Sequence, residues 1–315
     1  MLYSYIISRR ISKMELKQEF YSSLNTKEAK KSEILLKKFF PSEEQLGKDL
    51  IFFTTNELLE ANKKIPVLAQ YQSEINKALL KYFAYGTSKG YIEKSIINSD
   101  AVVLRLYEKD LGKMLVKSPY ELSRKFIEWF PTIHMGTPEC QYATILWLYF
   151  EGFSTDDILN IKIQDVGENS LTVGGETHII PPSIIPFVLK TRDAKIFNIY
   201  RKEGEVCNSQ KRCDNGMLIR TWNTLDKEKF KNFMNSVWKR VSKTGFELSA
   251  NALNLSGICW ETKQIEDETG ILSYNIFASK QNWDSMDYKR AWAKRKYAKY
   301  DYANYIRTFY PDEAK

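Results

Sequence analysis

The chain has 315 residues, with 47 Lys and Arg against 39 Asp and Glu and a formal net charge of +8. Hydrophobic residues make up 43% of it and aromatic residues 14%, which excludes an intrinsically disordered protein. No apolar run approaches the roughly 20 residues of a membrane-spanning helix, and the N-terminal basic pair follows the apolar residues instead of preceding them. These features predict a protein of the cytoplasm without a membrane partner.

Residues 1–92 are predicted to form a small domain of four helices. We expect helices over residues 14–21, 26–40 and 57–62, and a fourth that opens at Pro66. The second helix has apolar residues at helical spacing: Ile34, Leu35, Leu36 and Phe39. The fourth has an apolar stripe made of Leu68, Tyr71, Ile75, Leu79 and Phe83. Such stripes indicate helices that bury one face against each other.

Residues 93–118 are predicted to be a linker, strand-like over 101–107, and residues 119–315 a larger domain. In the larger domain the pattern indicates three helices, then two short strands, then a largely helical remainder. The expected helices cover 120–129 and 140–151 and begin at Thr155, and the expected strands cover 170–173 and 178–180. The predicted fold class is therefore mainly α with a small β-hairpin.

Several kinds of chemistry find no support in the sequence. The two histidines, His134 and His178, have no Cys or His neighbour at metal-ligand spacing. Cys207 and Cys213 are six positions apart and no second cysteine pair completes a zinc site, while irregularly spaced cysteines suit a reducing compartment. No glycine-rich phosphate loop is present. We therefore expect neither a metal nor a cofactor.

Positive charge is concentrated in two segments. Residues 190–243 contain 14 basic and 6 acidic residues, and residues 284–300 contain six basic and two acidic ones. Aromatic residues are interspersed in both segments. Basic charge gathered in this way is typical of surfaces that track the phosphates of a nucleic acid.

Residues 151–166, EGFSTDDILNIKIQDV, resemble the first catalytic box of the tyrosine recombinases, the family of the phage integrases. Gly152, Asp157, Ile158 and Asp165 fall in register with that box. Physically, Gly152 permits a tight turn between two helices, and Ser154 or Thr155 can cap the second one. The family then has a β-hairpin and an apolar-proline segment, which LTVGG followed by HIIP resembles, and a later box that NALNLS at 251–256 resembles in position.

This resemblance implies a tyrosine-recombinase-like fold, with a helical core-binding domain followed by a larger catalytic-like domain. The family cleaves DNA by attack of a tyrosine. Two arginines and a histidine stabilise the transition state, and a lysine in the hairpin protonates the leaving oxygen. Here the corresponding positions hold Ser154, Asn251 and Asn254, and no lysine lies between residues 166 and 189. The nucleophile position holds Trp292, with Tyr288 and Tyr297 on either side. We therefore expect degenerate catalytic positions and no enzymatic activity.

The function so implied is sequence-specific binding of double-stranded DNA at operator sites, as by an integrase-like transcriptional repressor of a prophage. The expected DNA-binding residues are Lys77, Lys81, Lys89, Arg220, Lys239, Arg240, Lys243, Asn251, Asn254, Lys289, Arg290, Lys294, Arg295 and Lys296. The C-terminal segment is a second candidate surface, for self-association. Two alternatives stay open: a divergent active recombinase that uses Arg220 or Arg240, and a protein-interaction module.

Overall fold

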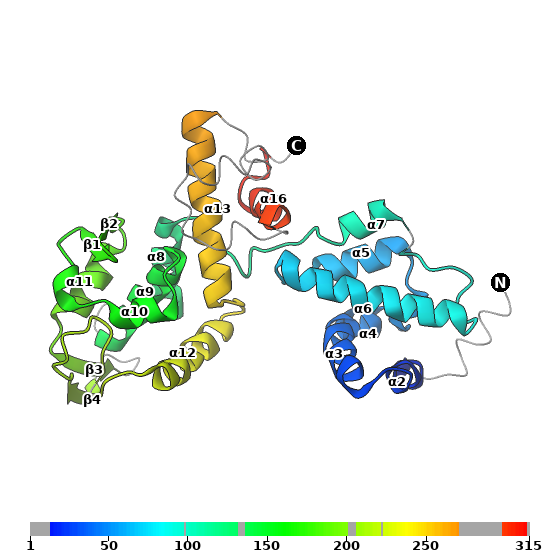
Figure 1. Ribbon diagram of the computed structural model, residues 1–315, viewed down its shortest axis with the longest axis horizontal. Helices are drawn as coiled ribbons and strands as arrows, with labels where there is room; N and C mark the ends of the chain where they lie inside the picture. Colours follow the sequence, from blue (N-terminus) through cyan, green and yellow to red (C-terminus); the bar gives the residue numbers. More distant parts are fainter. Residues whose placement is uncertain are drawn as a thin grey trace. The chain divides into compact units, whose positions relative to one another are not determined.

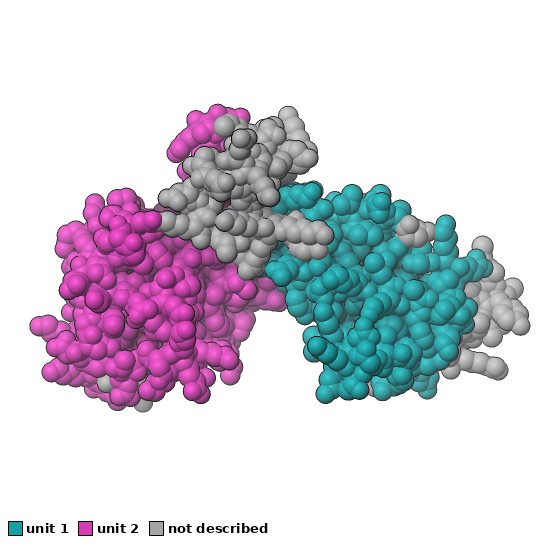
Figure 2. Space-filling view, in the orientation of Figure 1, with its two compact units in different colours: residues 1–111, 296–308, 314 teal, residues 112–295, 309–313, 315 magenta. Residues whose placement is uncertain are grey.

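The computed structural model describes residues 13–97, 99–131, 136–200, 206–221, 223–270 and 298–313. It is mainly helical, with two separate two-stranded antiparallel sheets. This confirms the predicted class and adds one hairpin to it. The chain divides into two compact units, shown in different colours in Figure 2. Unit 1 comprises residues 1–111 and 296–308, and unit 2 comprises residues 112–295 and 309–313.

Unit 1 is entirely helical in its described part (Figure 1). Its elements are α2 (Lys13–Ser22), α3 (Thr26–Leu36), the short 3-10 helix η1 (Lys37–Phe39), α4 (Phe40–Leu46), η2 (Leu50–Phe52), α5 (Thr55–Lys63), α6 (Ala69–Ser88), α7 (Asp100–Arg105) and α16 (Ala298–Phe309). The start of α5 has a capping box, in which Thr54 accepts a hydrogen bond from the amide of Glu57 and the Glu57 side chain accepts one from the amide of Thr54. The expected second helix is divided, because the chain continues from α3 through η1 into α4.

The core of unit 1 forms around α6. Ile75, Leu79 and Phe83 of the predicted stripe are fully buried, whereas Tyr71 is 38% exposed. Ile34, expected on the buried face of α3, is 61% exposed. Helical spacing therefore identified the buried face of α6 correctly except at its first turn, and misjudged one position of α3.

Residues 101–107 are not a strand. They fall mostly in α7, where the hydroxyl of Ser99 caps the helix by accepting a hydrogen bond from the amide of Val102. The paired valines favour a strand locally, but no neighbouring strand in the described chain offers an edge to pair with. The expected linker also contributes to the cores, since Leu106, Leu115 and Val116 are buried.

Helix α16 belongs to unit 1, although the sequence assigns it to the larger domain. The carboxylate of Asp301 accepts a hydrogen bond of 2.8 Å from the amide of Ala69, the first residue of α6. The side chain of Asn304 accepts from the amide of Lys109 at 3.1 Å and donates to the carbonyl of Tyr107 at 2.8 Å. Asp301 and Asn304 are buried. The C-terminal helix is thus bonded to the N-terminal helices through polar groups that water does not reach.

A buried polar network holds α5, α6 and the segment that follows α7 together. The side-chain nitrogen of Gln72 donates to the side-chain oxygens of Asn62 at 2.9 Å and Asn76 at 2.7 Å. The side-chain nitrogen of Asn62 in turn donates to the backbone carbonyl of Leu106 at 2.7 Å. The side-chain nitrogen of Lys109 donates to the carbonyl of Asn62. Burial, aided by the charge of Lys38, lowers the pKa of Lys109 to about 6. Lys109 is therefore mostly uncharged at neutral pH and adds little to the surface charge.

Unit 2 contains helices and both hairpins. Its elements are α8 (Pro119–Trp129), α9 (Thr137–Phe150), α10 (Thr155–Asn160), the 3-10 helix η3 (Ile163–Asp165), β1 (Ser170–Val173), β2 (Glu176–Ile179), α11 (Ile185–Asp193), β3 (Ile196–Tyr200), β4 (Val206–Lys211), α12 (Lys227–Ser242) and α13 (Ala250–Thr269). Helix α9 is buried along nearly its whole length and packs against α8, α11, α13 and β3 (Figure 1). It is the central helix of the unit.

The hairpin of β3 and β4 was not predicted, because the sequence after residue 180 reads as largely helical. The strand signal is the run Ile196 to Tyr200, which is rich in β-branched and aromatic residues. By contrast, the β1–β2 hairpin lies where it was expected, with Ser170 opposite Ile179 and Val173 opposite Glu176. None of the described helices is long and apolar enough to cross a membrane.

Replacement of the distant cap of α6 should loosen unit 1. Asp301→Ala removes the acceptor for the Ala69 amide and a negative charge from the positive end of the helix dipole, which should cost about 0.5–2 kcal/mol. The expected result is faster amide hydrogen exchange in the first turns of α6. The matched control is Asp312→Ala, an exposed aspartate in the tail. Equal exchange of α6 in the wild type and both variants would contradict the capping role.

Candidate nucleic-acid interface

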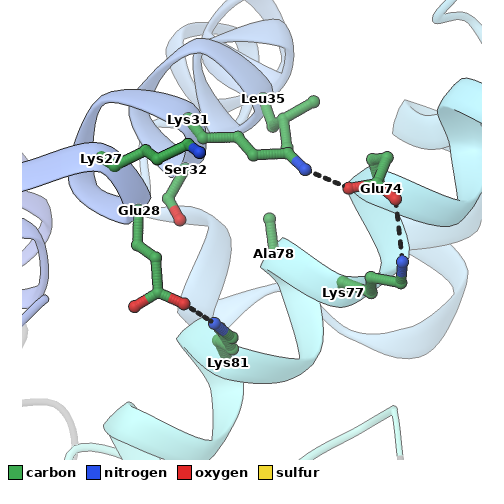
Figure 3. Close-up of a pocket in the computed structure, with 9 residues that line it drawn as sticks. All are labelled: Lys27, Glu28, Lys31, Ser32, Leu35, Glu74, Lys77, Ala78 and Lys81. Atoms are coloured by element: carbon green, nitrogen blue, oxygen red, sulfur yellow. Dashed lines mark hydrogen bonds and ion pairs between the residues drawn. The ribbon is translucent and has the colours of Figure 1, made fainter. Parts of the chain in front are cut away.

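The first candidate surface is a groove between α3 and α6 in unit 1, with a volume of about 310 Å³ (Figure 3). Its rim has two lysines from each helix, and we call it the lysine groove: Lys27, Lys31, Lys77 and Lys81. Buried Ser32, Leu35 and Ala78 form its floor, and Glu28 and Glu74 lie among the lysines. The structure thus brings the predicted Lys77 and Lys81 together with two lysines that the sequence analysis missed. Their signal was the spacing of four between Lys27 and Lys31 on one helix.

The charges of the lysine groove are only partly neutralised. Glu74 pairs with Lys31 and with Lys77 at 2.8 Å, and Glu28 pairs with Lys81 at 2.7 Å (Figure 3). Hydrogen bonds from Lys31 and Lys77 hold the pKa of the Glu74 carboxyl below its usual value. Four ammonium groups face two carboxylates, so positive charge remains. Ion pairs as exposed as these contribute about 0–1 kcal/mol, and a phosphate can replace the carboxylate at little cost.

Lys89 lies at the end of α6 and outside this groove. Its ammonium is 3.8 Å from the carboxylate of Glu19 and 5.7 Å from the centre of the Tyr85 ring. It is exposed and remains available to a ligand.

The second candidate surface is the exposed side of α12 in unit 2. Phe230, Met234, Val237 and Val241 form the buried side of this helix. The exposed side has lysines four to eight positions apart, and we call these residues the α12 basic face: Lys231, Lys239 and Lys243. Within the described ranges none of the three has a carboxylate at ion-pair distance. Lys231 was not predicted, although its helical spacing to Lys239 is visible in the sequence.

Arg240 belongs to the same helix but, unlike the three lysines, has a carboxylate partner. Its guanidinium lies 3.2 Å from the carboxylate of Glu139, which is buried, and 5.6 Å from the centre of the Tyr142 ring. The Arg240 guanidinium therefore contacts Glu139 and Tyr142 on one side, and its other side remains exposed to solvent.

The positions that the resemblance predicts to be degenerate catalytic ones have structural roles or are exposed. Gly152 has a φ of 91°, and the turn it allows places Ser154 at the cap of α10. The Ser154 hydroxyl accepts from the amide of Asp157 at 3.2 Å, and the Asp157 carboxylate accepts from the amide of Ser154 at 2.9 Å. Asn251 is exposed and Asn254 half-buried in the first turns of α13. The turn and cap expected at this box are confirmed.

Arg220 does not lie on an exposed surface, contrary to the expectation that it contacts DNA. It is 6% exposed, and its guanidinium donates to the carbonyl oxygens of Met217 at 2.7 Å and of Arg192 and Ala194 at 3.4 Å. Arg212 lies beside it, and burial together with the charge of Arg220 lowers the pKa of Arg212 to about 9. Both arginines donate mainly to backbone carbonyls, so they crosslink the chain and are not available to phosphates.

The remaining predicted residues lie outside the described part of the chain. They are His134, Lys289, Arg290, Lys294, Arg295 and Lys296, together with the recombinase-box positions Tyr288, Trp292 and Tyr297. In the described part, no three His, Cys, Asp or Glu residues form a group that could hold a metal ion. Comparison with known proteins gives no match, either to a family model or to a curated sequence.

Substitutions at Arg220 and Lys239 should separate structural from surface charge. All seven tryptophans lie in residues 112–295, so tryptophan fluorescence follows unit 2. Arg220→Gln should lower the free energy of unfolding of unit 2 by about 1–3 kcal/mol, because buried carbonyls lose their donors. Lys239→Gln, on the exposed face, should change it by less than about 0.5 kcal/mol. If a denaturant titration shows that both variants lower the free energy of unfolding equally, Arg220 does not crosslink the chain.

Proposed function

We propose that this protein binds double-stranded DNA sequence-specifically and does not cut it, as a transcriptional repressor of prophage genes built on a tyrosine-recombinase-like scaffold. The observation that carries the proposal is the α12 basic face, where three exposed lysines have no carboxylate partner within the described ranges. A local excess of positive charge on one exposed face attracts polyanions, and duplex DNA has one phosphate charge per about 1.7 Å of its axis.

The lysine groove supports the same proposal from unit 1. Its four lysines are exposed, their ion pairs are weak, and the excess charge is positive. A protein that contacts DNA with both units gains affinity, because after the first contact the second becomes intramolecular. Each unit alone should therefore bind more weakly than the whole chain.

The absence of cleavage follows from the residue types at the box positions. Ser154 already caps α10, and Asn251 and Asn254 carry no charge with which to stabilise a phosphorane-like transition state. Removal of one such donor typically costs about 2.7–4 kcal/mol of transition-state stabilisation. Serine and asparagine can still hydrogen-bond an intact phosphate, which is compatible with binding alone.

The α12 basic face is tested by salt dependence. The triple variant Lys231→Gln, Lys239→Gln, Lys243→Gln should bind all duplexes more weakly, and the log–log slope of affinity against salt should fall by about 0.9 for each lost phosphate contact. The control is Lys37→Gln, Lys63→Gln, Lys64→Gln, which removes the same charge from exposed positions of unit 1 outside the groove.

Two outcomes would contradict the proposal. If the wild-type chain shows no salt-dependent binding to duplex DNA, the function is wrong. If both triple variants reduce the slope equally, net charge and not the α12 basic face governs binding.

Catalytic inactivity is tested separately with supercoiled plasmid. We expect no relaxation, no covalent adduct on nicked duplexes, and no gain of activity from Ser154→Arg alone, because catalytic groups of this kind act as a unit. Relaxation by the purified wild-type chain that disappears on changing one tyrosine to Phe would favour the divergent recombinase instead.

A further inference from the structure

In the β3–β4 hairpin of unit 2, one face packs on the protein through Phe197 of β3, and the opposite face is turned toward solvent. The register places Phe197 opposite Gln210, and Phe197 is buried at 4% exposure where β3 packs against α9. The hydroxyl of Thr137 at the start of α9 donates to the carbonyl of Ile196 at 3.0 Å. These contacts hold the hairpin to the central helix of the unit by its inner face, so its outer face is presented by a rigid support.

The outer face follows from the alternation of the strands. Asn198 lies opposite Ser209, and Ile196 lies opposite Lys211, so these four side chains share the side away from Phe197. Ser209 and Lys211 are exposed, and Ile196 is 48% exposed. The Ser209 hydroxyl lies 2.8 Å from the amide oxygen of Asn198. This bond fixes the Asn198 amide and leaves its N–H groups for another acceptor.

The charge of the hairpin suits a polyanion. The described residues 194–200 and 206–213 include no Asp or Glu, and both Lys195 and Lys211 are exposed. The connecting residues 201–205, RKEGE, lie outside the described part of the chain and have two basic and two acidic side chains. Asn208 and Gln210 are also exposed and uncharged, but the register places them on the same face as Phe197. The described outer face therefore has an amide, a hydroxyl and an ammonium group and no carboxylate that would repel a phosphate.

The dimensions and side-chain types agree with one groove of DNA. The major groove of B-DNA is about 12 Å wide and admits a two-stranded β-ribbon, whose strands are about 4.8 Å apart. In that groove asparagine hydrogen-bonds to adenine and lysine to guanine, and serine can hydrogen-bond to either of these bases. An apolar side chain can contact the methyl group of thymine. The outer face of the hairpin has one side chain of each of these four kinds: Asn198, Lys211, Ser209 and Ile196.

We propose that the outer face of the β3–β4 hairpin enters the major groove and reads base edges, with the Asn198–Ser209 pair as its specificity element. This inference rests on the proposed function and adds to it the element that selects the sequence, whereas the α12 basic face and the lysine groove contact phosphates. Asn198 reads the base directly, and Ser209 orients the amide.

The test uses the full chain and duplexes that the wild-type protein selects from a random pool. The variant Asn198→Ala, Ser209→Ala should bind the selected duplex at least about tenfold more weakly, while its affinity for a scrambled duplex and its salt slope stay within about twofold of the wild type. The control is Thr172→Ala, Thr177→Ala, which removes the exposed cross-strand pair of the β1–β2 hairpin and should leave both affinities unchanged.

A second selection, made with the variant on the same pool, gives a readout that does not depend on the amount of folded protein. We expect the base preference to be lost at one or two positions. If the variant keeps the base preference and affinity of the wild type, the inference is wrong and the proposed function still stands. The same holds if the variant binds all duplexes equally more weakly, because that result indicates a phosphate contact. If the wild type binds DNA but selects no sequence, both this inference and the sequence specificity of the proposed function are wrong. If it binds no DNA at all, the whole proposed function has failed.

Discussion

The first amide of α6 has no acceptor from its own segment, because Leu68 at the cap has no side-chain oxygen. The carboxylate of Asp301, 232 positions away along the chain, accepts its hydrogen bond. Unit 1 depends on this contact, since α6 is the helix around which its core forms and an uncapped buried helix end is costly. The same contact, with those of Asn304, makes the C-terminal helix part of the N-terminal unit. The last helix of the chain is therefore required for the first unit to be complete.

Unit 2 depends on a comparable set of internal polar contacts. The guanidinium of Arg212 donates to the carbonyls of Thr191 at 2.7 Å and of Ala194 and Leu218 at 3.2 Å, and also to the side chain of Gln141. It thereby joins α11, the segment after β4 and the central helix α9. A buried cation is tolerated here because several carbonyl dipoles surround it, and burial lowers its pKa.

These internal contacts decide how much of the net charge faces a partner. Arg212 and Arg220 bind carbonyls, Arg240 binds Glu139, and Lys109 is mostly uncharged. Among the described residues, the α12 basic face and the lysine groove each have such an exposed local excess of positive charge. This local excess, and not the net charge of the chain, determines how strongly a nucleic acid is attracted, because salt screens the interaction between exposed charges that are more than roughly 10 Å apart.

Local patterns in the sequence determined most of the helices and one hairpin. The Thr54 cap, the Gly152–Ser154 turn and the stripe of Ile75, Leu79 and Phe83 act over a few residues, so they can be read without the fold. By the same helical spacing Lys77 and Lys81 lie away from this stripe, and both are exposed. Only the tertiary structure decided that α16 completes unit 1, that residues 101–107 are largely helical, and that Arg220 is buried. Each of these depends on a partner distant in the chain, or on the lack of one, and no local pattern of residues contains that information.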